Sequence, residues 1–142
     1  MGEAPLTIRP GTAADLERIR AIQDSAPHAA HWEPRSYLDY QLLVAEQDTE
    51  MTGFLAWRIT ARGEAEILNL VIHPQHRRQG AATALLQRVL EGFRGVIYLE
   101  VRESNSSARA FYEKLGFRTA GRRPGYYSSP PETAVVMKFF SC

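Results

Sequence analysis

Hydrophobic and polar positions alternate at the start of the chain and then change to a helical spacing. Leu6–Arg9 alternates over a short stretch, which predicts a strand. Thr12 is typical of a helix N-cap, and Asp15 follows three residues later, where a capping carboxylate is favoured. The predicted helix runs through about Asp24, and its apolar stripe is formed by Leu16, Ile19 and Ile22.

Three strand-like stretches follow a loop at 25–33 and a short helix that we expect to begin at Pro34. They span Leu42–Gln47, Thr52–Thr60 and Ala65–Ile72, and tight turns join them. Consecutive strands joined in this way predict an antiparallel meander. His73-Pro74 should end the pairing, because proline has no amide proton to donate.

From Gly80 the apolar positions recur every three or four residues, which predicts an amphipathic helix over 80–93. Its apolar face comprises Ala82, Leu85, Leu86, Val89, Leu90 and Phe93. Val96–Arg102 then predicts another strand. Strand 65–72, helix 80–93 and strand 96–102 form a βαβ unit, so these two strands should be parallel and the sheet mixed.

The last part of the chain predicts one more helix and two strands. Ser104 or Asn105 can cap a helix that ends at Gly116, a residue type common just after a helix C-terminus. Phe117–Arg122 and Ala134–Phe140 are predicted strands, and Pro124–Thr133 between them is predicted to be a loop.

Length and composition favour one soluble domain, spanning 1–142. Lys and Arg number 17 and Asp and Glu 16, so no strong field favours nucleic acid or a membrane. No signal peptide or membrane-spanning run is evident. The single cysteine, Cys142, has no internal partner, which fits a reducing cytoplasm. We therefore expect a cytoplasmic monomer or weak dimer.

The turn Arg77-Arg78-Gln79-Gly80-Ala81-Ala82 lies where a predicted strand gives way to a helix. The first N–H groups of a helix have no helical partners and the helix dipole favours an anion there. Glycine and alanine let phosphate oxygens approach, and the arginines add charge. The alternative is a plain basic turn.

Three further polar residues admit both a structural and a chemical role. Glu100 lies in an apolar strand, on the same face as Tyr98 and Arg102. It is either a solvent-facing side chain or a carboxylate at the ligand-binding end of a parallel strand. Asn105 can be an N-cap that also faces a ligand, and Tyr112 can be a packing residue or a catalytic one.

Metal and hydrolase chemistry find little support in the sequence. His28, His31, His73 and His76 have no carboxylate or thiolate at a convincing ligand spacing, so we expect no metal. Neither a G-x-S-x-G elbow nor a P-loop lysine is present.

Taken together, these segments resemble the GNAT superfamily of acetyl-CoA-dependent N-acetyltransferases, and within it the ribosomal-protein alanine N-acetyltransferases of the RimI type. The resemblance covers essentially the whole chain and is most specific over 66–140. It rests on the stretches Asn69–Pro74, Arg78–Gly80, Leu99–Asn105, Tyr112–Phe117, Arg122–Tyr127 and Glu132–Met137, and on His28–Trp32 near the N-terminus.

The resemblance implies an α/β (α+β) fold, with a mixed, mostly antiparallel sheet of about seven strands, a splayed parallel pair in its middle and helices on both faces. It assigns Glu100 as general base and Tyr112 as general acid. The residues implied to bind acetyl-CoA are Leu70, Val71, Ile72, Arg77, Arg78, Gln79, Gly80, Ala81, Ala82, Thr83 and Asn105. Those implied or suggested to hold the acceptor are Trp32, Tyr126 and Tyr127, although Tyr127 also suits a core position.

The chain departs from the family pattern at three places. Ala82 stands where glycine is usual, and His73 replaces a common acidic residue. The loop Ser128–Glu132 is rich in proline and short, which puts peptide specificity in doubt more than catalysis.

The resemblance leaves the acceptor open. The favoured acceptor is the N-terminal alanine α-amine of a ribosomal small-subunit protein. A lysine side chain, a polyamine or an antibiotic amine is the alternative, although the balanced overall charge shows no sign of a strongly acidic cleft. The third possibility is a non-catalytic acyl-CoA-binding regulatory module, against which the presence of both Glu100 and Tyr112 argues.

Overall fold

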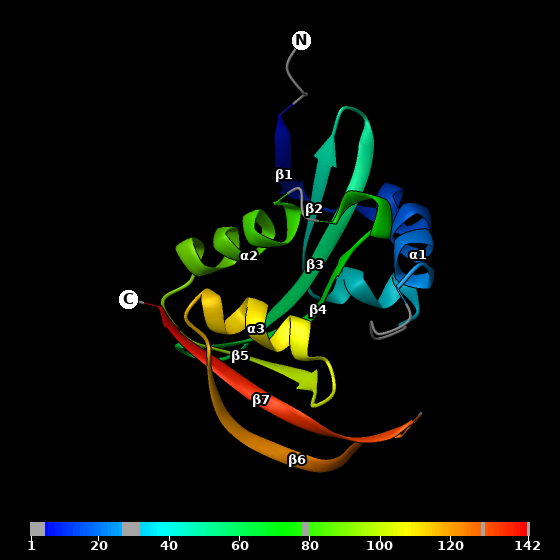
Figure 1. Ribbon diagram of the computed structural model, residues 1–142. Helices are drawn as coiled ribbons and strands as arrows, with labels where there is room; N and C mark the ends of the chain where they lie inside the picture. The colour runs from blue at the N-terminus through cyan, green and yellow to red at the C-terminus, as the bar shows by residue number, and fades with distance from the viewer. Residues whose placement is uncertain (1–4, 27–31, 78–79, 129, 142) are drawn as a thin grey trace. The chain divides into compact units, whose positions relative to one another are not determined.

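Within the part of the chain that the structure describes, seven strands and three α-helices follow one another in the order that the hydrophobic pattern predicts (Figure 1). The computed structural model describes residues 5–26, 32–77, 80–128 and 130–141. The strands are β1 (Leu6–Pro10), β2 (Gln41–Gln47), β3 (Glu50–Ala61), β4 (Glu64–Ile72), β5 (Gly95–Arg102), β6 (Arg118–Ser128) and β7 (Pro131–Ser141). The α-helices are α1 (Leu16–Asp24), α2 (Ala81–Gly92) and α3 (Ser106–Lys114), and short 3₁₀ helices occupy Ala13–Asp15, Pro34–Asp39 and Pro74–His76.

The strands form one mixed sheet in the order β1-β2-β3-β4-β5-β7-β6. The predicted parallel pair is confirmed, because β4 and β5 pair in parallel from Glu64 with Val96 to Glu66 with Tyr98. β5 and β7 pair antiparallel from Gly95 with Ser141 to Arg102 with Ala134. β5 is therefore held by β7 along its whole length.

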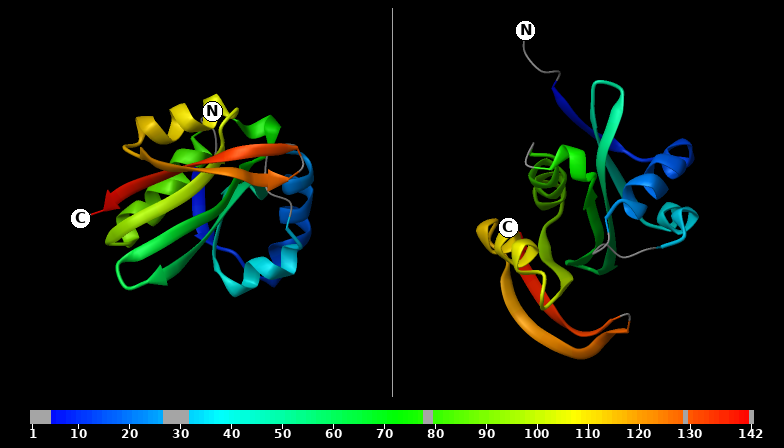
Figure 2. Two further views of the ribbon diagram at one scale, coloured as in Figure 1. Left: turned by 90° about the horizontal axis from the view of Figure 1, so that it is seen from below. Right: turned by 45° about the vertical axis from the view of Figure 1, so that its right-hand side comes forward.

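The chain divides into two compact units, and the first comprises Met1–Arg58 and Leu68–Gly92. Ile19 and Ile22 of α1 pack in a buried cluster with side chains of β2, β3 and β4, among them Val44, Phe54 and Val71. α2 packs near β1 and β2, and Figure 2 shows α1 and α2 on opposite faces of these strands. This unit confirms the expectation of helices on both faces.

The predicted cap of the first helix is confirmed. The carboxylate of Asp15 accepts a hydrogen bond of 2.8 Å from the backbone N–H of Thr12. It also forms an ion pair of 2.7 Å with Arg9 of β1, whose side chain additionally reaches Glu46 of β2. Arg9 lowers the pKa of the Asp15 carboxyl, because its guanidinium hydrogen-bonds the charged form.

The second unit comprises Ile59–Ile67 and Phe93–Cys142. In β5 the side chains of Ile97, Leu99 and Val101 are buried, and the residues between them are partly exposed, as the alternation predicts. In α3 the ring of Tyr112 contacts Phe117, and Phe117 contacts Phe139 of β7. These contacts lay α3 against the sheet through aromatic side chains.

The prediction of a loop over Pro124–Thr133 is wrong. β6 runs on to Ser128 and β7 begins at Pro131, so most of this segment is an antiparallel hairpin. The Pro124-Gly125 pair that suggests a turn instead lies where the register shifts, between Arg123 and Tyr127. Pairing resumes at Tyr127 with Glu132 and continues at Ser128 with Pro131.

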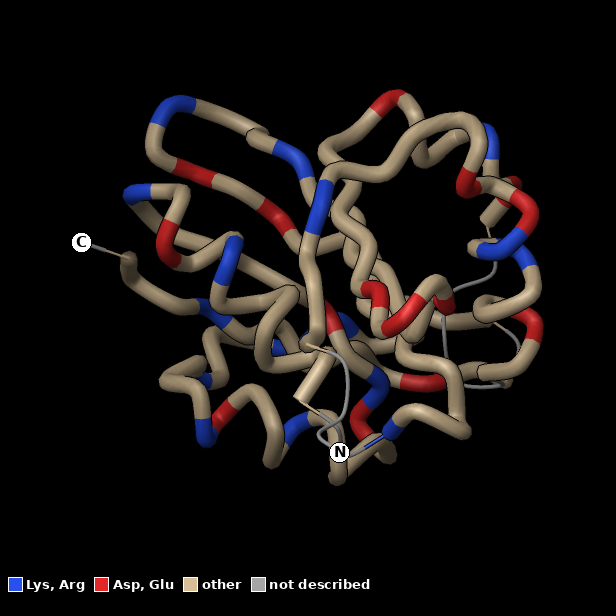
Figure 3. Tube along the Cα trace, turned by 90° about the horizontal axis from the view of Figure 1, so that it is seen from above, with Lys and Arg blue, Asp and Glu red and all other residues tan. Residues whose placement is uncertain are grey.

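Charged residues of both signs are interspersed along each unit (Figure 3), in keeping with the balanced composition. Among the helices of the described residues, none is long and apolar enough to cross a membrane.

Gly95 is the glycine whose replacement should damage the second unit most clearly. Its φ is +139°, and a Cβ there would lie 2.2 Å from the backbone oxygen of Gly63. Gly95→Ala should lower the free energy of unfolding by about 2–4 kcal/mol, because neither backbone can yield. Denaturant unfolding measures the change. The control is Gly92→Ala in α2, where a Cβ would meet nothing within 4 Å. That change should be neutral or stabilising by up to about 1 kcal/mol, and equal losses in both variants would contradict the prediction.

Candidate active site

The predicted phosphate turn begins after the 3₁₀ helix Pro74–His76. His73 caps that helix, because its Nδ1 accepts a hydrogen bond of 3.1 Å from the backbone N–H of Gln75. Arg77 follows and is exposed. The predicted positions Arg78 and Gln79 lie outside the described residues, so the geometry of the turn is known on either side of them.

Gly80 shows why the turn needs glycine before the helix. Its φ is +86°, in the left-handed region that side chains rarely adopt, and a Cβ would meet nothing within 4 Å. The requirement therefore comes from the backbone and not from crowding. The first helical turn closes with a hydrogen bond of 3.0 Å from Ala84 N–H to Gly80 O.

The start of α2 has the features of an anion site. In any α-helix the first N–H groups lack helical acceptors, and the dipole adds partial positive charge. Ala81 is buried, and Ala82 and Thr83 are partly buried. Small side chains thus line the helix start, and the alanine at position 82 adds only one methyl group to it.

The strand predicted to lie along the cofactor ends at Ile72. Leu70 and Ile72 are partly exposed on one face of β4, and Val71 is buried on the other. The backbone at this end is fixed by a hydrogen bond of 2.8 Å from His73 N–H to Thr52 O of β3. Gly53 allows this close approach, since a Cβ there would lie 2.7 Å from Val71 O.

Asn69, the residue before this stretch, ends a buried polar chain. Its Nδ2 donates to the hydroxyl of Tyr37 at 2.9 Å. That hydroxyl donates to Gln23 Oε1 at 2.5 Å, and Gln23 Nε2 donates to Trp32 O at 2.7 Å. The ring of Trp32 stacks on Tyr37 at 5.5 Å. Trp32, predicted to contact the acceptor, therefore packs against the core of the first unit, while His28 and His31 lie outside the described residues.

In the second unit, Glu100 lies on β5 opposite Val136 of β7. Arg123 of β6 reaches it, with 3.1 Å between Nη1 and Glu100 Oε1. The Glu100 side chain is 18% exposed and that of Arg123 59%. The other carboxylate oxygen, Oε2, is buried and has no direct hydrogen-bond partner among the described residues. The Glu100 carboxylate is thus mostly buried and does not point freely into solvent.

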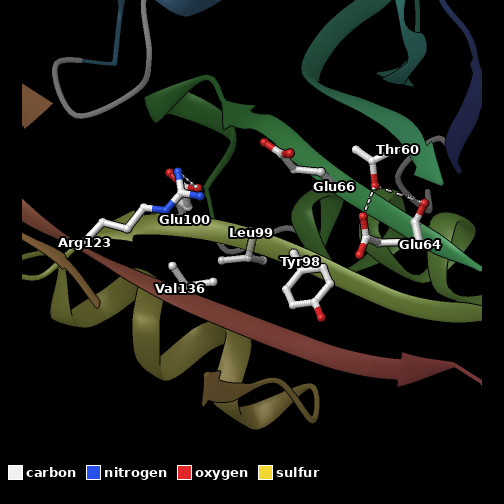
Figure 4. A pocket seen from close by; sticks show the side chains of 8 residues that line it. All are labelled: Thr60, Glu64, Glu66, Tyr98, Leu99, Glu100, Arg123 and Val136. Carbon is white, nitrogen blue, oxygen red and sulfur yellow. Dashed lines mark hydrogen bonds and ion pairs between the residues drawn. The ribbon is translucent and has the colours of Figure 1, made fainter. Parts of the chain in front are cut away.

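Glu100 lines a pocket of about 250 Å³ (Figure 4). The lining residues are Thr60, Glu64, Glu66, Tyr98, Leu99, Glu100, Arg123 and Val136. Glu64 is held by Thr60, whose hydroxyl donates to Oε2 at 2.6 Å. Three carboxylates and one guanidinium give the pocket an acidic character that the balanced composition does not reveal. Such a pocket suits a cationic or amine ligand.

The two tyrosines predicted to hold the acceptor lie on β6 with their rings 5.1 Å apart. Tyr126 is 50% exposed, and the Glu100 carboxylate, as an acceptor for its hydroxyl, raises the pKa of Tyr126. Tyr127 is partly buried beneath the Arg102 guanidinium, which lies 4.2 Å from the ring centre. Burial raises the pKa of Tyr127 to about 12, and Glu100 adds to the shift.

Tyr112 and Asn105 lie on α3 as predicted. Asn105 is the N-cap, and its Oδ1 accepts a hydrogen bond of 3.3 Å from Ala108 N–H. Burial raises the pKa of Tyr112 to about 12, and Tyr127 adds to the shift. The Tyr112 hydroxyl therefore keeps its proton at neutral pH and is able to donate it.

Glu132 is a site residue that the sequence analysis missed. Its Oε2 accepts a hydrogen bond of 2.5 Å from Ser104 N–H, and its Oε1 lies 3.3 Å from Arg102 Nη1. It thereby ties the start of β7 to the chain entering α3. The signal would have been the pairing of β7, which places Glu132 opposite Tyr127 of β6 and Ala134 opposite Arg102 of β5.

No group of three or more His, Cys, Asp or Glu side chains is arranged to hold a metal ion in the described part of the chain. His76 instead lies 3.3 Å from Glu50, as an ion pair when it is protonated.

Comparison with known proteins gives a consistent result. The model of the Acetyltransferase (GNAT) family matches residues 13–117. The chain is 34% identical to the [ribosomal protein bS18]-alanine N-acetyltransferase of Escherichia coli K12, over 92% of this chain and 95% of that protein. It is 30% identical to the N-alpha-acetyltransferase of Sulfurisphaera tokodaii, over 85% of each chain.

The fold is also shared with a solved structure. The crystal structure of the ribosomal-protein-S18-alanine N-acetyltransferase from Escherichia coli superimposes with a TM-score of 0.85 and 30% identity. The match covers 96% of this chain and 94% of that one, which confirms the predicted fold class.

The role of Glu132 can be tested at the backbone it holds. Glu132→Ala removes the acceptor of the Ser104 N–H, so the Ser104 and Asn105 amides should exchange faster with solvent. Glu132→Gln keeps one acceptor oxygen and should retain most of the protection. Hydrogen exchange followed by NMR compares the two variants. Exchange at Ser104 that is the same in Glu132→Ala and the original protein would show that the contact does not order this segment.

Proposed function

Because this chain belongs to the Acetyltransferase (GNAT) family, we propose that it transfers an acetyl group from acetyl-CoA to the N-terminal α-amine of a ribosomal small-subunit protein that begins with alanine. The observation that carries the proposal is the mostly buried carboxylate of Glu100, which lines a pocket. The two relatives named above are both acetyltransferases of N-terminal amines by name, which supports the α-amine more strongly than alanine itself.

The proposal includes the organisation of the enzyme. Residues 1–142 work as one acetyltransferase domain, which the family match supports because it includes residues of both units. The protein acts in the cytoplasm as a monomer or weak dimer, on a protein substrate and without nucleic acid, membrane or metal.

Acetyl-CoA, the acetyl donor, supplies a thioester and an anionic pyrophosphate. The start of α2 fits that pyrophosphate, because the positive φ of Gly80 and the small residues after it leave backbone N–H groups open to an anion. Residues 77–83 hold the phosphates, with Arg77 and Arg78 adding charge. The backbone of Leu70–Ile72 and the side chain of Asn105 hold the rest of the molecule.

Glu100 acts as the general base. An amine attacks only when uncharged, and an α-amine has a pKa near 8 whereas a lysine amine has one near 10.4. Glu100 takes the proton directly or through water, and its position on a paired strand keeps it in place. The backbone N–H groups of Leu70–Ile72 stabilise the negative charge that develops on the carbonyl oxygen.

Tyr112 acts as the general acid. A tyrosine hydroxyl carries its proton at neutral pH, and Tyr112 gives that proton to the departing sulfur as the thiolate forms. An acceptor that binds as an ammonium loses two protons in becoming an amide, and the departing sulfur gains one from Tyr112, so each turnover releases one proton to water by way of Glu100. Tyr126 and Tyr127 flank the acceptor peptide, and Trp32 supports the acceptor side through its packing.

A second acceptor class is favoured by one observation. The three glutamates of the pocket would attract a polyamine or a lysine side chain as well as an α-ammonium. The chemistry would then be unchanged and only the acceptor would differ.

A panel of acceptors tests the proposed function. The protein is incubated with acetyl-CoA and one of three acceptors: an Ala-starting peptide without lysine, the same peptide with a blocked N-terminus and one lysine, or a polyamine. Release of free thiol is followed, and the largest kcat/KM should be found with the free N-terminus. A preference for the polyamine would reject the α-amine. No release with any acceptor would favour the non-catalytic acyl-CoA-binding module.

The two catalytic assignments are tested by Glu100→Gln and Tyr112→Phe. Each should lower kcat by roughly 10²–10⁴-fold, the usual contribution of a positioned acid or base. Affinity for acetyl-CoA, measured calorimetrically, should change little. The Arg122→Gln variant is the control, since Arg122 pairs with Glu103 and does not line the pocket. Unchanged kcat in both test variants would show that the acid and base lie elsewhere.

A further inference from the structure

Arg123 occupies one side of the carboxylate that is proposed to accept the proton. We infer that Arg123 is a specificity residue: its guanidinium competes with a protonated amine for Glu100 but not with a neutral one, and so favours α-amine acceptors over lysine. The inference rests on the proposed function and deepens it by naming the residue that discriminates between the two acceptor classes.

The geometry places Arg123 between two partners. Its Nη1 lies 3.1 Å from Glu100 Oε1, and its guanidinium carbon lies 5.5 Å from the centre of the Tyr126 ring. Both are ordinary contacts of a guanidinium, one with a carboxylate and one with an aromatic face. In Figure 4 the Arg123 side chain extends to the Glu100 carboxylate within the pocket.

The two members of the ion pair differ in their exposure. The Arg123 side chain is 59% exposed and lies on a part of β6 where the pairing register is irregular. The Glu100 side chain is 18% exposed and lies on β5, which pairs with β7 along its whole length. An exposed arginine can turn towards water at little cost, but the carboxylate cannot follow it. Arg123 is therefore the displaceable partner, and Glu100 stays in place.

Charge decides which acceptors Arg123 disfavours. An ammonium group must replace the guanidinium at Glu100 or approach it as a like charge, and both cost binding energy. A neutral amine carries no such charge and approaches the Glu100 carboxylate without having to replace Arg123 as its ionic partner. Among the described residues, the other titratable groups that line the pocket are Glu64, Glu66 and Tyr98. Arg123 is the one cation of that described lining, and it opposes the attraction that the carboxylates exert on an ammonium.

The discrimination follows from the ordinary pKa values of the acceptors. With α-amines near 8 and lysine near 10.4, the neutral fraction at neutral pH is roughly two hundred times larger for the α-amine. A lysine acceptor therefore depends far more on binding in its charged form. Because Arg123 weakens the binding of a charged amine at Glu100, it lowers the acetylation of lysine more than the acetylation of an N-terminus.

The experiment compares kcat/KM for the Ala-starting peptide with that for the blocked lysine peptide. Arg123→Gln should lower the ratio of the two values about two- to fivefold, the size expected of a partly exposed ion pair, mainly through a lower KM for lysine. Arg123→Lys keeps the cation and should restore the ratio. Arg122→Gln, which removes a neighbouring cation paired with Glu103, should leave it unchanged. A ratio that is the same in Arg123→Gln and the original protein overturns the inference while the proposed function stands.

A binding measurement separates the inference from catalysis altogether. n-Butylammonium is titrated into the protein at about pH 6, where the amine is fully charged, and NMR shifts give its affinity. Arg123→Gln should bind it about two- to fivefold more tightly than the original protein, and Arg123→Lys should not. Equal affinity in all three proteins overturns the inference even if no acceptor is ever acetylated.

Discussion

The arrangement of the second unit depends on the pairing of β5 with β7. That ladder runs from Gly95 to Arg102, so every side chain of β5 has a fixed face. One face buries Ile97, Leu99 and Val101, and the other presents Tyr98 and Glu100 to the pocket. Parallel pairing with β4 covers only the first part of β5 among the residues described, from Val96 to Tyr98. Glu100 is thus held from one side by a strand and is left accessible on the other.

Sheet pairing also explains why so many polar groups converge near Glu100. β6 and β7 bring Arg123, Tyr126, Tyr127 and Glu132 to the carboxyl end of β5. Three of these residues make a contact that depends on charge: Arg123 with Glu100, Tyr127 with the Arg102 guanidinium, and Glu132 with the Ser104 N–H. The same proximity contributes to two raised pKa values. The Glu100 carboxylate raises the pKa of Tyr126 chiefly as the acceptor of its hydroxyl, and burial raises the pKa of Tyr127, with the charge of Glu100 adding to the shift.

Local patterns in the sequence were sufficient for most of the fold. The helical spacing after Gly80, the alternation in 96–102 and the Thr12–Asp15 cap each involve residues close together in the chain, and all three are confirmed. The helical crossover between β4 and β5 then predicted that these two strands are parallel. The strands at 117–122 and 134–140 were predicted in the same way, whereas the continuation of their hairpin through 124–133 was not, since Pro124 and Gly125 favour a loop.

The same distinction applies to the site. Glu100, Asn105 and Tyr112 were identified by motif resemblance, and the structure gives them suitable surroundings, although their catalytic roles remain predictions. The acidic pocket and Glu132 were missed, because overall charge says nothing about which carboxylates a sheet brings together. Trp32 was selected by its place in a motif, whereas its ring packs on Tyr37.

The residues that we propose to choose the acceptor therefore lie in the least predictable part of the chain. The phosphate turn needs only a helix start and one glycine with positive φ, which a short motif can encode. Under the proposal, recognition of an amine depends on side chains from separate strands that contact the same carboxylate, that of Glu100. A shift of the β6 register by one residue would point Arg123 to the other face of the sheet, away from Glu100. The irregularity between Arg123 and Tyr127 is where such a shift occurs. Small changes in this hairpin can thus alter which amine is accepted without disturbing the strand that carries the base.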